Sequence, residues 1–472
     1  MQTLRLPEPI FPVPIFETDW IRDLDESIQA DICALLTLKH KVMILDTKQR
    51  LSAAQKVDQA EVLRVAITPL VERLSPFFTR KPVPQSDVEY ALFVLNSSVL
   101  KHLALVFLRA ILPLARQRHE RLGLCVHRAA IVVRYWQWQS WLAGRTPSMT
   151  SVDWLLGLLE FAHQNDLMAF EKVDRASHRQ SKSSVGGQIA WALMLIAARP
   201  VRLNLAQLLM TQRICDRWRE MVHFLTQKVG LDSISFGTLY PQAPTAAVLS
   251  WLDFSGVLRK IEQRYAALNR GQTPMQLKLG TELDTPGTKQ LLKILKKRYQ
   301  QMVSVPQVPP QDPRAQLCDL YFDSFNAYPI FLNNNNHPRI SCAPAEEWTQ
   351  FGTFFWRDVK TQGARHLSPH LVASDSPARL GIISALCEDD FGGLFGTVSW
   401  FVQHVEAGRV LLDSKAAPAF LLQENAQHFL LVPFDTPLTL QQEYVVSGFS
   451  LQQITPTQLA ERGANFLRYS LR

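Results

Sequence analysis

Apolar residues recur every three or four positions through most of the first 300 residues, a spacing that predicts amphipathic helices. Ser52 followed by Gln55, and Ser86 or Asp87 ahead of a long apolar run, are typical helix starts. We expect Pro113 to kink or end the helix that it interrupts. The predicted helices span residues 21–40, 52–74, 86–112, 119–142, 153–164, 187–198, 203–229, 246–269 and 288–302.

Short stretches of Pro, Gly, Ser and Asn separate these helices, which favours antiparallel helical pairs. Such pairs can stack as a solenoid that resembles tetratricopeptide arrays, although the sequence has no clean 34-residue repeat. Residues 232–240 place Ile, Phe and Leu among Ser, Gly and Thr, and we interpret them as an extended connection rather than an independent strand. A subdomain boundary is expected near residues 148–151.

The hydrophobic pattern changes after residue 303. Residues 304–313 contain four prolines and no helical periodicity, which predicts an extended and fairly stiff linker. Beyond it, short runs rich in Val, Ile, Phe and Trp alternate with Gly, Asn and Asp, as in strands joined by tight turns. Strands are expected within residues 317–332, 339–342, 356–400, 402–405, 410–412, 419–423, 429–433, 443–447, 449–454 and 465–471, the last of them closing a barrel.

The predicted fold class is therefore α+β with several domains. An all-α, solenoid-like domain, single or divided in two, covers residues 1–303. The linker follows at residues 304–313, and a C-terminal β-barrel covers residues 314–472. A chain of 472 residues is long for one core, which agrees with this division.

Composition places the chain among ordinary globular proteins, with 47% hydrophobic and 19% charged residues. Its six cysteines are scattered without close pairs, which favours reduced thiols in a cytosol over disulfides or a zinc site. The first 15 residues lack the apolar core of a signal peptide. The longest apolar stretch, residues 92–115, is interrupted by Lys101, His102 and Arg109, so we expect no membrane span and a cytoplasmic location.

Charge is unevenly distributed along the chain, whose net charge is +8. Residues 1–304 hold 39 Lys and Arg against 26 Asp and Glu, whereas residues 305–472 hold 11 against 16. The helical part is thus +13 and the β part −5. A basic surface attracts acidic partners, so the helical domain is the expected contact for a protein partner.

Residues 356–363 read Trp-Arg-Asp-Val-Lys-Thr-Gln-Gly. This stretch resembles the PilZ domain, a β-barrel module that binds cyclic di-GMP in many bacteria. That family has an acidic or amide residue, one residue, Ser, two residues and then Gly, and this chain has Asp358, Lys360 and Gly363 at those positions. The whole chain resembles a longer bacterial architecture in which a helical N-terminal region precedes a divergent PilZ barrel, and residues 187–200 share in this resemblance.

The resemblance implies a role for each matching residue. Asp358 would contact a guanine base and Gly363 would shape the turn. Lys360 stands where the family has Ser, and it could meet a phosphate or block the pocket. The family's second signature is a pair of arginines four positions apart just before the barrel, where this chain has only Arg314.

Other candidate sites have simpler interpretations. His366 and His370 are separated by a Ser-Pro pair, which predicts surface loop histidines rather than a metal site, and no metal is expected. Arginine pairs at helical spacing are typical of a solvated helix face; they are Arg175 with Arg179 and Arg213 with Arg217. An aromatic cluster at helical spacing is typical of core packing rather than of a nucleic-acid platform; it comprises Tyr135, Trp136, Trp138 and Trp141. Glu388, Asp389 and Asp390 are expected in an acidic hairpin turn.

The sequence shows no P-loop, dinucleotide-binding glycines, His-Glu-x-x-His motif or nucleophile elbow, so we predict a protein that is not an enzyme and needs no cofactor. The first hypothesis is a signalling protein that binds cyclic di-GMP and regulates motility, pili or biofilm through protein partners. Ligand would act by ordering the linker at residues 304–313. The alternative is a helical scaffold whose barrel no longer binds nucleotide.

Overall fold

The computed structural model describes residues 21, 23–174, 176, 182–230, 232–239, 249–300, 315–333, 345–358, 361, 363–389, 392–402, 404–412, 415–424 and 427–472. The chain forms two compact units. One comprises Met1–Lys81 and Gln85–Val305, and the other comprises Pro82–Pro84 and Pro306–Arg472. The linker predicted at residues 304–313 and the strand predicted at residues 339–342 lie outside the described residues.

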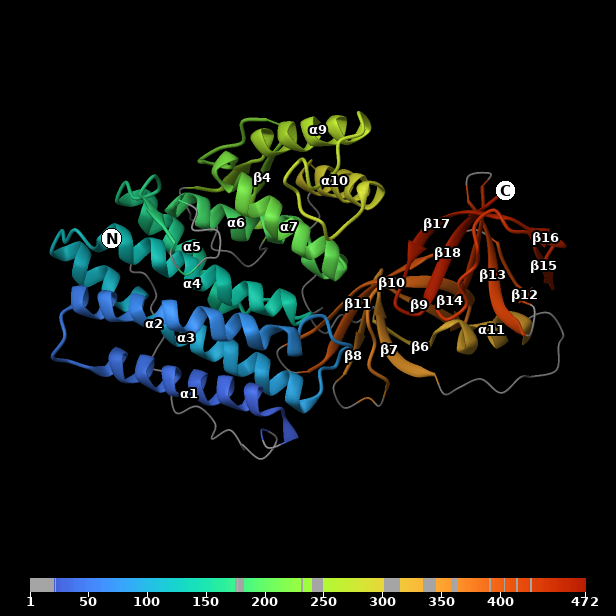
Figure 1. The fold of residues 1–472 in the computed structure, drawn as a ribbon, viewed down its shortest axis with the longest axis horizontal. Helices are drawn as coiled ribbons and strands as arrows, with labels where there is room; N and C mark the ends of the chain where they lie inside the picture. The colour runs from blue at the N-terminus through green and yellow to red at the C-terminus, as the bar shows by residue number, and fades with distance from the viewer. Residues whose placement is uncertain are drawn as a thin grey trace. The chain divides into compact units, whose positions relative to one another are not determined.

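The first unit is built mainly of helices, drawn from blue to yellow in Figure 1. They are α1 (Glu26–Thr47), α2 (Ala53–Leu74), α3 (Asp87–Arg116), α4 (Leu122–Leu142), α5 (Met149–Gln164), α6 (Val185–Ala197), α7 (Leu205–Trp218), α8 (Phe236–Leu239), α9 (Ser255–Asn269) and α10 (Thr285–Gln300). Short 3₁₀ turns follow or precede several of them: η2 (Ser75–Phe77), η3 (Pro200–Arg202) and η4 (Arg219–Met221).

Local sequence signals set several helix ends. Ser52 caps α2 and forms a reciprocal capping box with Gln55, and Ser86 does the same for α3 with Glu89. Pro113 does not end α3, which continues for three further residues to Arg116. A proline near the C-terminal end of a helix removes only one hydrogen bond of the ladder, so the last turn can still form.

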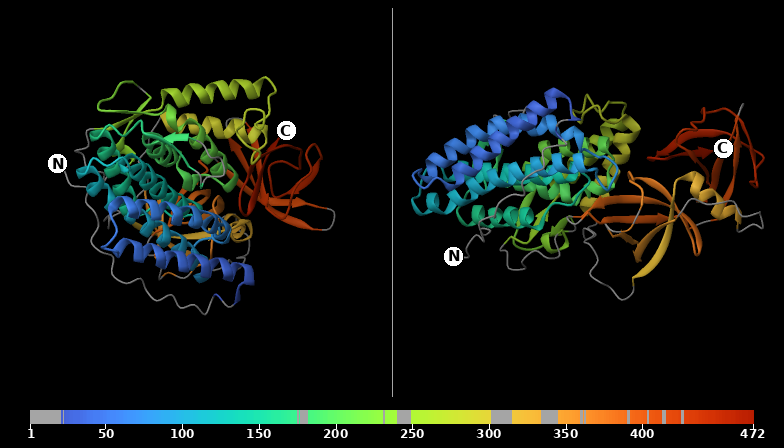
Figure 2. Two further views of the ribbon diagram at one scale, coloured as in Figure 1. Left: turned by 60° about the vertical axis from the view of Figure 1, so that its left-hand side comes forward. Right: turned by 90° about the horizontal axis from the view of Figure 1, so that it is seen from below.

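The core of this unit is a single large cluster of apolar side chains. Helices α1, α2 and α3 lie side by side, as the blue helices of Figure 2 show, and α3 packs on α4. All thirteen residues of α6 are buried, as expected for a helix that is apolar all round. Among the described residues, α3 alone is long and apolar enough to cross a membrane, and 61% of its apolar window is buried inside the protein.

The helical region also contains two small antiparallel sheets that the pattern of apolar residues does not predict. One pairs β1 (Glu171–Val173) with β2 (Lys182–Ser184), and the other has the order β3 (His223–Leu225), β5 (Trp251–Asp253), β4 (Ser233–Ser235). The interpretation of residues 232–240 as a mere connection is therefore wrong for β4. Strands of three residues are too short to show a periodicity of two.

The second unit contains a closed antiparallel barrel with the strand order β10-β11-β8-β7-β6-β9. Its strands are β6 (Gln316–Phe322), β7 (Glu346–Phe351), β8 (Phe354–Arg357), β9 (His370–Asp375), β10 (Ala378–Glu388) and β11 (Leu394–Trp400). The predicted fold class, a helical region followed by a β-barrel, is confirmed.

A seven-stranded sheet follows the barrel in the same unit. Its order is β16 (Gln453–Ile454), β15 (Tyr444–Ser447), β12 (Val405–Leu411), β13 (Ala416–Glu424), β14 (Gln427–Pro433), β18 (Phe466–Leu471), β17 (Pro456–Arg462). The expectation that residues 465–471 close the barrel is wrong. β18 pairs with β14 and β17, and β6 with β9 closes the barrel instead.

Residues 324–333, predicted as part of a strand, form helix α11 (Ser324–Asn333). The Asp323 carboxylate accepts the Asn326 backbone amide at 2.9 Å, which favours a helix start at this point. Tyr328 and other apolar residues of α11 then pack against Phe420 of β13. Their apolar character is shared by strands and helices, so periodicity over ten residues did not separate the two.

Candidate functional site

The residues that resemble the PilZ motif form the connection between β8 and β9. β8 pairs with β7 on one side and β11 on the other, so the end of the strand is held from both sides. Its side chains alternate in the usual way: Phe355 and Arg357 are buried, whereas Trp356 is half-buried. Asp358 continues this alternation on the half-buried side. We call residues 358–363 the ligand loop, after the ligand contacts that the PilZ resemblance implies; the structure describes residues 358, 361 and 363 of it.

A buried ionic cluster lies next to Gly363, the last residue of the ligand loop. Glu346 of β7 accepts hydrogen bonds from the Arg357 guanidinium and from His366 Nε2, the latter at 2.8 Å. Glu346 also accepts the Ala364 backbone amide at 2.7 Å, and Arg357 donates to the Ala364 carbonyl at 3.1 Å through both terminal nitrogens. Arg357 and His366 are each 3% exposed. These charge-assisted bonds fix the backbone where the ligand loop ends.

This cluster explains why the loop ends in glycine. A Cβ atom placed on Gly363 would lie 2.0 Å from Arg357 Nη1 and 2.9 Å from Glu346 Cδ. Non-bonded atoms cannot approach this closely, so any larger residue would displace the ion pair or the loop. The motif glycine thus has a steric function against the Glu346–Arg357 pair.

The protonation states in the cluster follow from burial and pairing. Burial by itself raises the pKa of Glu346, but the hydrogen bond and charge of His366, the Ala364 amide and the Arg357 charge together lower it below its usual value. Glu346 is therefore ionised at neutral pH. Burial and the neighbouring His366 lower the pKa of His370 to about 3, so His370 is neutral.

The prediction of surface loop histidines is wrong for His366. Its ring stacks on Phe322 with ring centroids 3.7 Å apart, and its centroid lies 5.3 Å from that of His370. A Ser-Pro pair does prevent a helix here, but the loop folds inward and not outward. Among the described residues no group of three or more His, Cys, Asp or Glu side chains could hold a metal ion.

The β10–β11 hairpin turn borders the same strand end, because Leu394 of β11 pairs with Arg357. In this turn the Asp389 carboxylate accepts the Gly393 amide at 2.9 Å, as expected for an acidic hairpin turn. A Cβ on Gly393 would lie 3.0 Å from Trp356 Nε1, so the turn packs closely on that ring. The end of β8 is thus flanked by acidic groups.

Two of the four predicted ligand residues are described by the structure. Asp358 and Gly363 lie at the two ends of the ligand loop. Lys360 and Arg314 lie outside the described residues, so their positions remain predictions. Asp390 of the acidic turn and the pair Arg175 with Arg179 also lie outside them.

Sequence reasoning missed Glu346 and the roles of His366 and Arg357. Arg357 directly precedes Asp358 in the motif, which is the only local signal. Its pairing with Glu346 depends on the register of β7 against β8, in which Thr349 faces Trp356. That register is not visible in the sequence.

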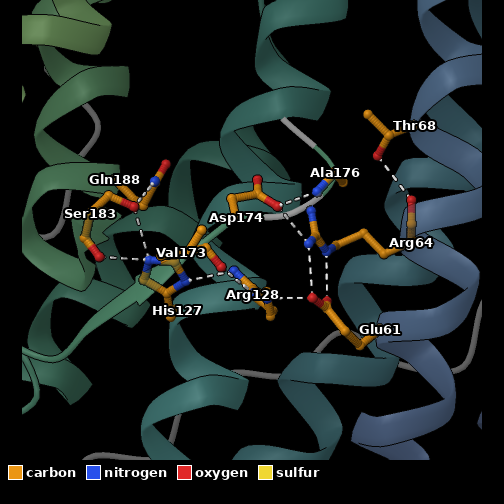
Figure 3. Close-up of polar contacts among 10 residues, drawn as sticks. All are labelled: Glu61, Arg64, Thr68, His127, Arg128, Val173, Asp174, Ala176, Ser183 and Gln188. Carbon is orange, nitrogen blue, oxygen red and sulfur yellow. Dashed lines mark hydrogen bonds and ion pairs between the residues drawn. The ribbon is translucent and has the colours of Figure 1, made fainter. Parts of the chain in front are cut away.

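A second polar cluster lies inside the helical unit (Figure 3). Arg64 of α2 binds Glu61 through two hydrogen bonds of 2.7 and 2.9 Å, and it binds Asp174 at 2.7 Å. Arg128 of α4 lies 2.9 Å from Glu61. Two arginines and two carboxylates thus balance each other's charges. Buried charged groups require such pairing.

This cluster continues to a buried histidine. His127, with no exposed surface, hydrogen-bonds through Nε2 to the Ser183 carbonyl at 2.9 Å, and Gln188 Nε2 donates to the Ser183 hydroxyl at 2.6 Å. Burial and the Arg128 charge lower the pKa of His127 to about 3, so it is neutral. The cluster ties α2, α4 and α6 to the strands β1 and β2, so we interpret it as a structural centre.

The remaining candidates of the helical unit are also structural. Trp136, Trp138 and Trp141 are buried, and Trp138 meets Trp191 edge to face at 5.9 Å, which confirms core packing. Arg213 does not stand on a free solvated face, because its guanidinium pairs with Glu282.

One family model matches the chain. Residues 19–228 match the family described as the cyclic-di-GMP receptor FimW, N-terminal domain. The matched region runs from the approach to α1 through β3, and it includes residues 187–200, which carried part of the resemblance noted in the sequence. The chain matches no curated protein and no solved structure.

The match covers less than half of the chain and stops well before the barrel. It is nevertheless independent of the ligand loop, because the loop lies more than 100 residues beyond the matched region. Over residues 19–228 the chain is therefore similar to the N-terminal domain of the cyclic-di-GMP receptor FimW, and this region is mainly helical.

Proposed function

We propose that this protein is a signalling protein that binds cyclic di-GMP at the ligand loop of its barrel. The match of residues 19–228 to the N-terminal domain of a cyclic-di-GMP receptor carries the proposal. The spacing of Asp358 and Gly363 in the connection between barrel strands β8 and β9, together with the fixed end of the loop, supports it. The protein would act by binding and not by catalysis.

Asp358 is the proposed contact for guanine. The Watson–Crick edge of guanine presents two adjacent N–H donors, and an ionised carboxylate offers two acceptor oxygens in a matching geometry. Asp358 is half-buried and directly follows the last residue of β8. Lys360 and Arg314 would supply positive charge to the phosphates.

Arg357 is not available for the phosphates. Its guanidinium is 3% exposed and already donates to Glu346 and to the Ala364 carbonyl. The β part of the chain is also net negative. Phosphate binding therefore depends on Lys360 and Arg314 more than it does in a site with two free arginines.

A scaffold that has lost nucleotide binding is the second candidate. Lys in the motif's Ser position, a single arginine ahead of the barrel, and the acidic groups beside β8 favour it. In both candidates the basic helical region would engage a protein partner, and the regulated process would be motility, pili or biofilm formation.

Calorimetric titration of the full chain with cyclic di-GMP at physiological salt tests the first candidate. Wild-type protein should bind, and Asp358→Asn should lose binding because an amide cannot accept both guanine N–H groups. The matched control is Asp319→Asn, which removes the same charge from an exposed position on β6. It should leave affinity unchanged or slightly increase it.

The two variants separate base recognition from general electrostatics. If cyclic di-GMP were attracted only by charge, removing either carboxylate would tighten binding and neither substitution would abolish it. Loss with Asp358→Asn alone would establish the carboxylate as a specific contact. Absence of binding by the wild-type protein at high ligand concentration would refute the receptor function and leave the scaffold.

A further inference from the structure

Three residues from the connection between η2 and α3 belong to the barrel unit. Pro82, Val83 and Pro84 group with residues 306–472, whereas Lys81 and Gln85 group with the helices. We call Pro82–Pro84 the strap. Residues so far upstream are not expected in a C-terminal barrel, and no local pattern in the sequence predicts them there.

Backbone hydrogen bonds hold the strap to the end of the ligand loop. The Val83 amide donates to the His366 carbonyl at 2.8 Å, and the His366 amide donates to the Val83 carbonyl at 2.7 Å, which forms an isolated antiparallel bridge. The two flanking prolines have no N–H group, so the pairing is confined to Val83. Arg365 adds hydrogen bonds of 2.8 Å each to the carbonyls of Pro82 and Pro84.

The Val83 side chain is part of the barrel core. It is 4% exposed and packs in the cluster that contains Leu320, Trp348 and Phe355. Apolar burial therefore adds to the hydrogen bonds in holding the strap. The segment is inserted into the barrel rather than laid over its surface.

A continuous set of contacts leads from the strap to the ligand loop. His366 is bridged to Val83 by its backbone, and its ring donates to Glu346. Glu346 also accepts the Ala364 amide and pairs with Arg357, and the side chains of Glu346 and Arg357 lie against Gly363. Each step is a hydrogen bond between buried or half-buried groups, so a shift of Val83 displaces the anchor of the loop.

We propose that the strap is a positioning element of the ligand loop, so that affinity for cyclic di-GMP depends on Val83. The choice of cyclic di-GMP as the ligand rests on the proposed function. The effect of the strap on the position of the loop does not. By linkage, ligand that favours the anchored loop also favours the anchored strap. The strap leads within three residues to Asp87, the first residue of α3, which gives ligand binding a route into the helical chain.

The test compares Val83→Ala with Val398→Ala in the full chain. Both substitutions remove two methyl groups from the same core cluster, but Val398 lies on β11 and pairs with Ile383, away from the ligand loop. Hydrogen exchange of the peptide containing residues 361–367 is measured without ligand. Cyclic di-GMP affinity is then measured by titration.

We expect Val83→Ala to speed exchange at residues 361–367 and to weaken cyclic di-GMP binding at least fivefold. Val398→Ala should do neither beyond a twofold change, although thermal unfolding should show a comparable loss of stability. Val83→Ile, which keeps the apolar branch, should retain wild-type exchange. A merely structural role would affect the two alanine variants alike.

The outcomes separate this proposal from the function on which it partly rests. If no variant and no wild-type protein binds cyclic di-GMP, the proposed function fails while the exchange data still decide the positioning role. Equal exchange at residues 361–367 in both alanine variants would overturn the strap as a positioning element. If the wild-type protein binds cyclic di-GMP and both alanine variants bind it with equal affinity, the link between the strap and the ligand is overturned.

Discussion

The buried pair of Arg64 and Asp174 gives a quantitative test of the helical unit. We consider Arg64→Met, which keeps an unbranched side chain of similar length and removes the charge. Arg64 is 2% exposed and provides the hydrogen bonds to both Glu61 and Asp174 (Figure 3). After the change Glu61 still has Arg128 at 2.9 Å. Asp174 keeps only the Ala176 amide at 3.0 Å among its described hydrogen bonds.

The expected loss in the free energy of unfolding follows from the Asp174 carboxylate, which loses its arginine partner. Breaking a buried ion pair by removing one partner costs about 3–5 kcal/mol, because the remaining charge is uncompensated. The Arg128 charge and the Ala176 amide still favour the Asp174 carboxylate, so we expect a loss near the lower end, about 3 kcal/mol. Asp174→Asn added to Arg64→Met removes the stranded charge and should restore about half of this loss.

The pH dependence has a definite sign. In the wild-type protein burial raises the pKa of Asp174, but Arg64 and Arg128 outweigh it, and the folded pKa is below the ordinary value. That stabilisation is present above the unfolded pKa of about 3.9 and is lost as pH falls through the folded pKa. Without Arg64 the burial effect dominates, so the folded pKa rises. The difference in the free energy of unfolding between wild type and Arg64→Met should therefore become smaller as the pH is lowered from 7.5 to 4.5.

Denaturant unfolding followed by tryptophan fluorescence measures these losses, since Trp136, Trp138 and Trp141 report on the core of the helical unit. Arg73→Met on the same helix is the matched control. Arg73 is more than half exposed in its pair with Asp31, and exposed pairs contribute at most about 1 kcal/mol. A loss for Arg64→Met no larger than for Arg73→Met, or no rescue by Asp174→Asn, would refute the reasoning.

Two further predictions concern the ligand loop. Gly363→Ala should abolish cyclic di-GMP binding and speed hydrogen exchange at residues 361–367. Gly230→Ala should change neither, because nothing lies within 4 Å of its added Cβ. Wild-type affinity in Gly363→Ala would show that the loop tolerates the methyl group. Lys360→Ser should weaken binding and reduce its salt dependence, because a phosphate contact is lost. Tighter binding by Lys360→Ser would instead mean that the lysine blocks the pocket.

Much of the helical fold could be predicted because its signals are local. Ser52 with Gln55 and Ser86 with Glu89 mark two helix starts. Each signal is contained within one helical turn. Helix α11 and the three-residue strands could not be predicted, since their apolar residues suit both kinds of element and tertiary contacts decide between them. Val83 lies at the opposite extreme, because its partner His366 is nearly 300 residues away.

The candidate site divides in the same way. Asp358 and Gly363 could be proposed from the sequence because the motif lies within six residues. The groups that fix their backbone could not, because Glu346 and His366 come from different strands and loops and meet only through the barrel register. A buried carboxylate, arginine and histidine are also each too common in sequence to predict a contact.

The structure changes the weight that each motif residue carries. Gly363 is required by its approach to Arg357 and Glu346, a packing reason that holds whether or not a ligand is present. Its retention therefore does not distinguish a receptor from a scaffold. Asp358 is different, because it follows the buried Arg357 on the half-buried side of the strand end, beside a turn that is itself acidic. Asp358→Asn removes the charge and one acceptor oxygen at this position, so the response of cyclic di-GMP binding to this substitution decides between the two functions.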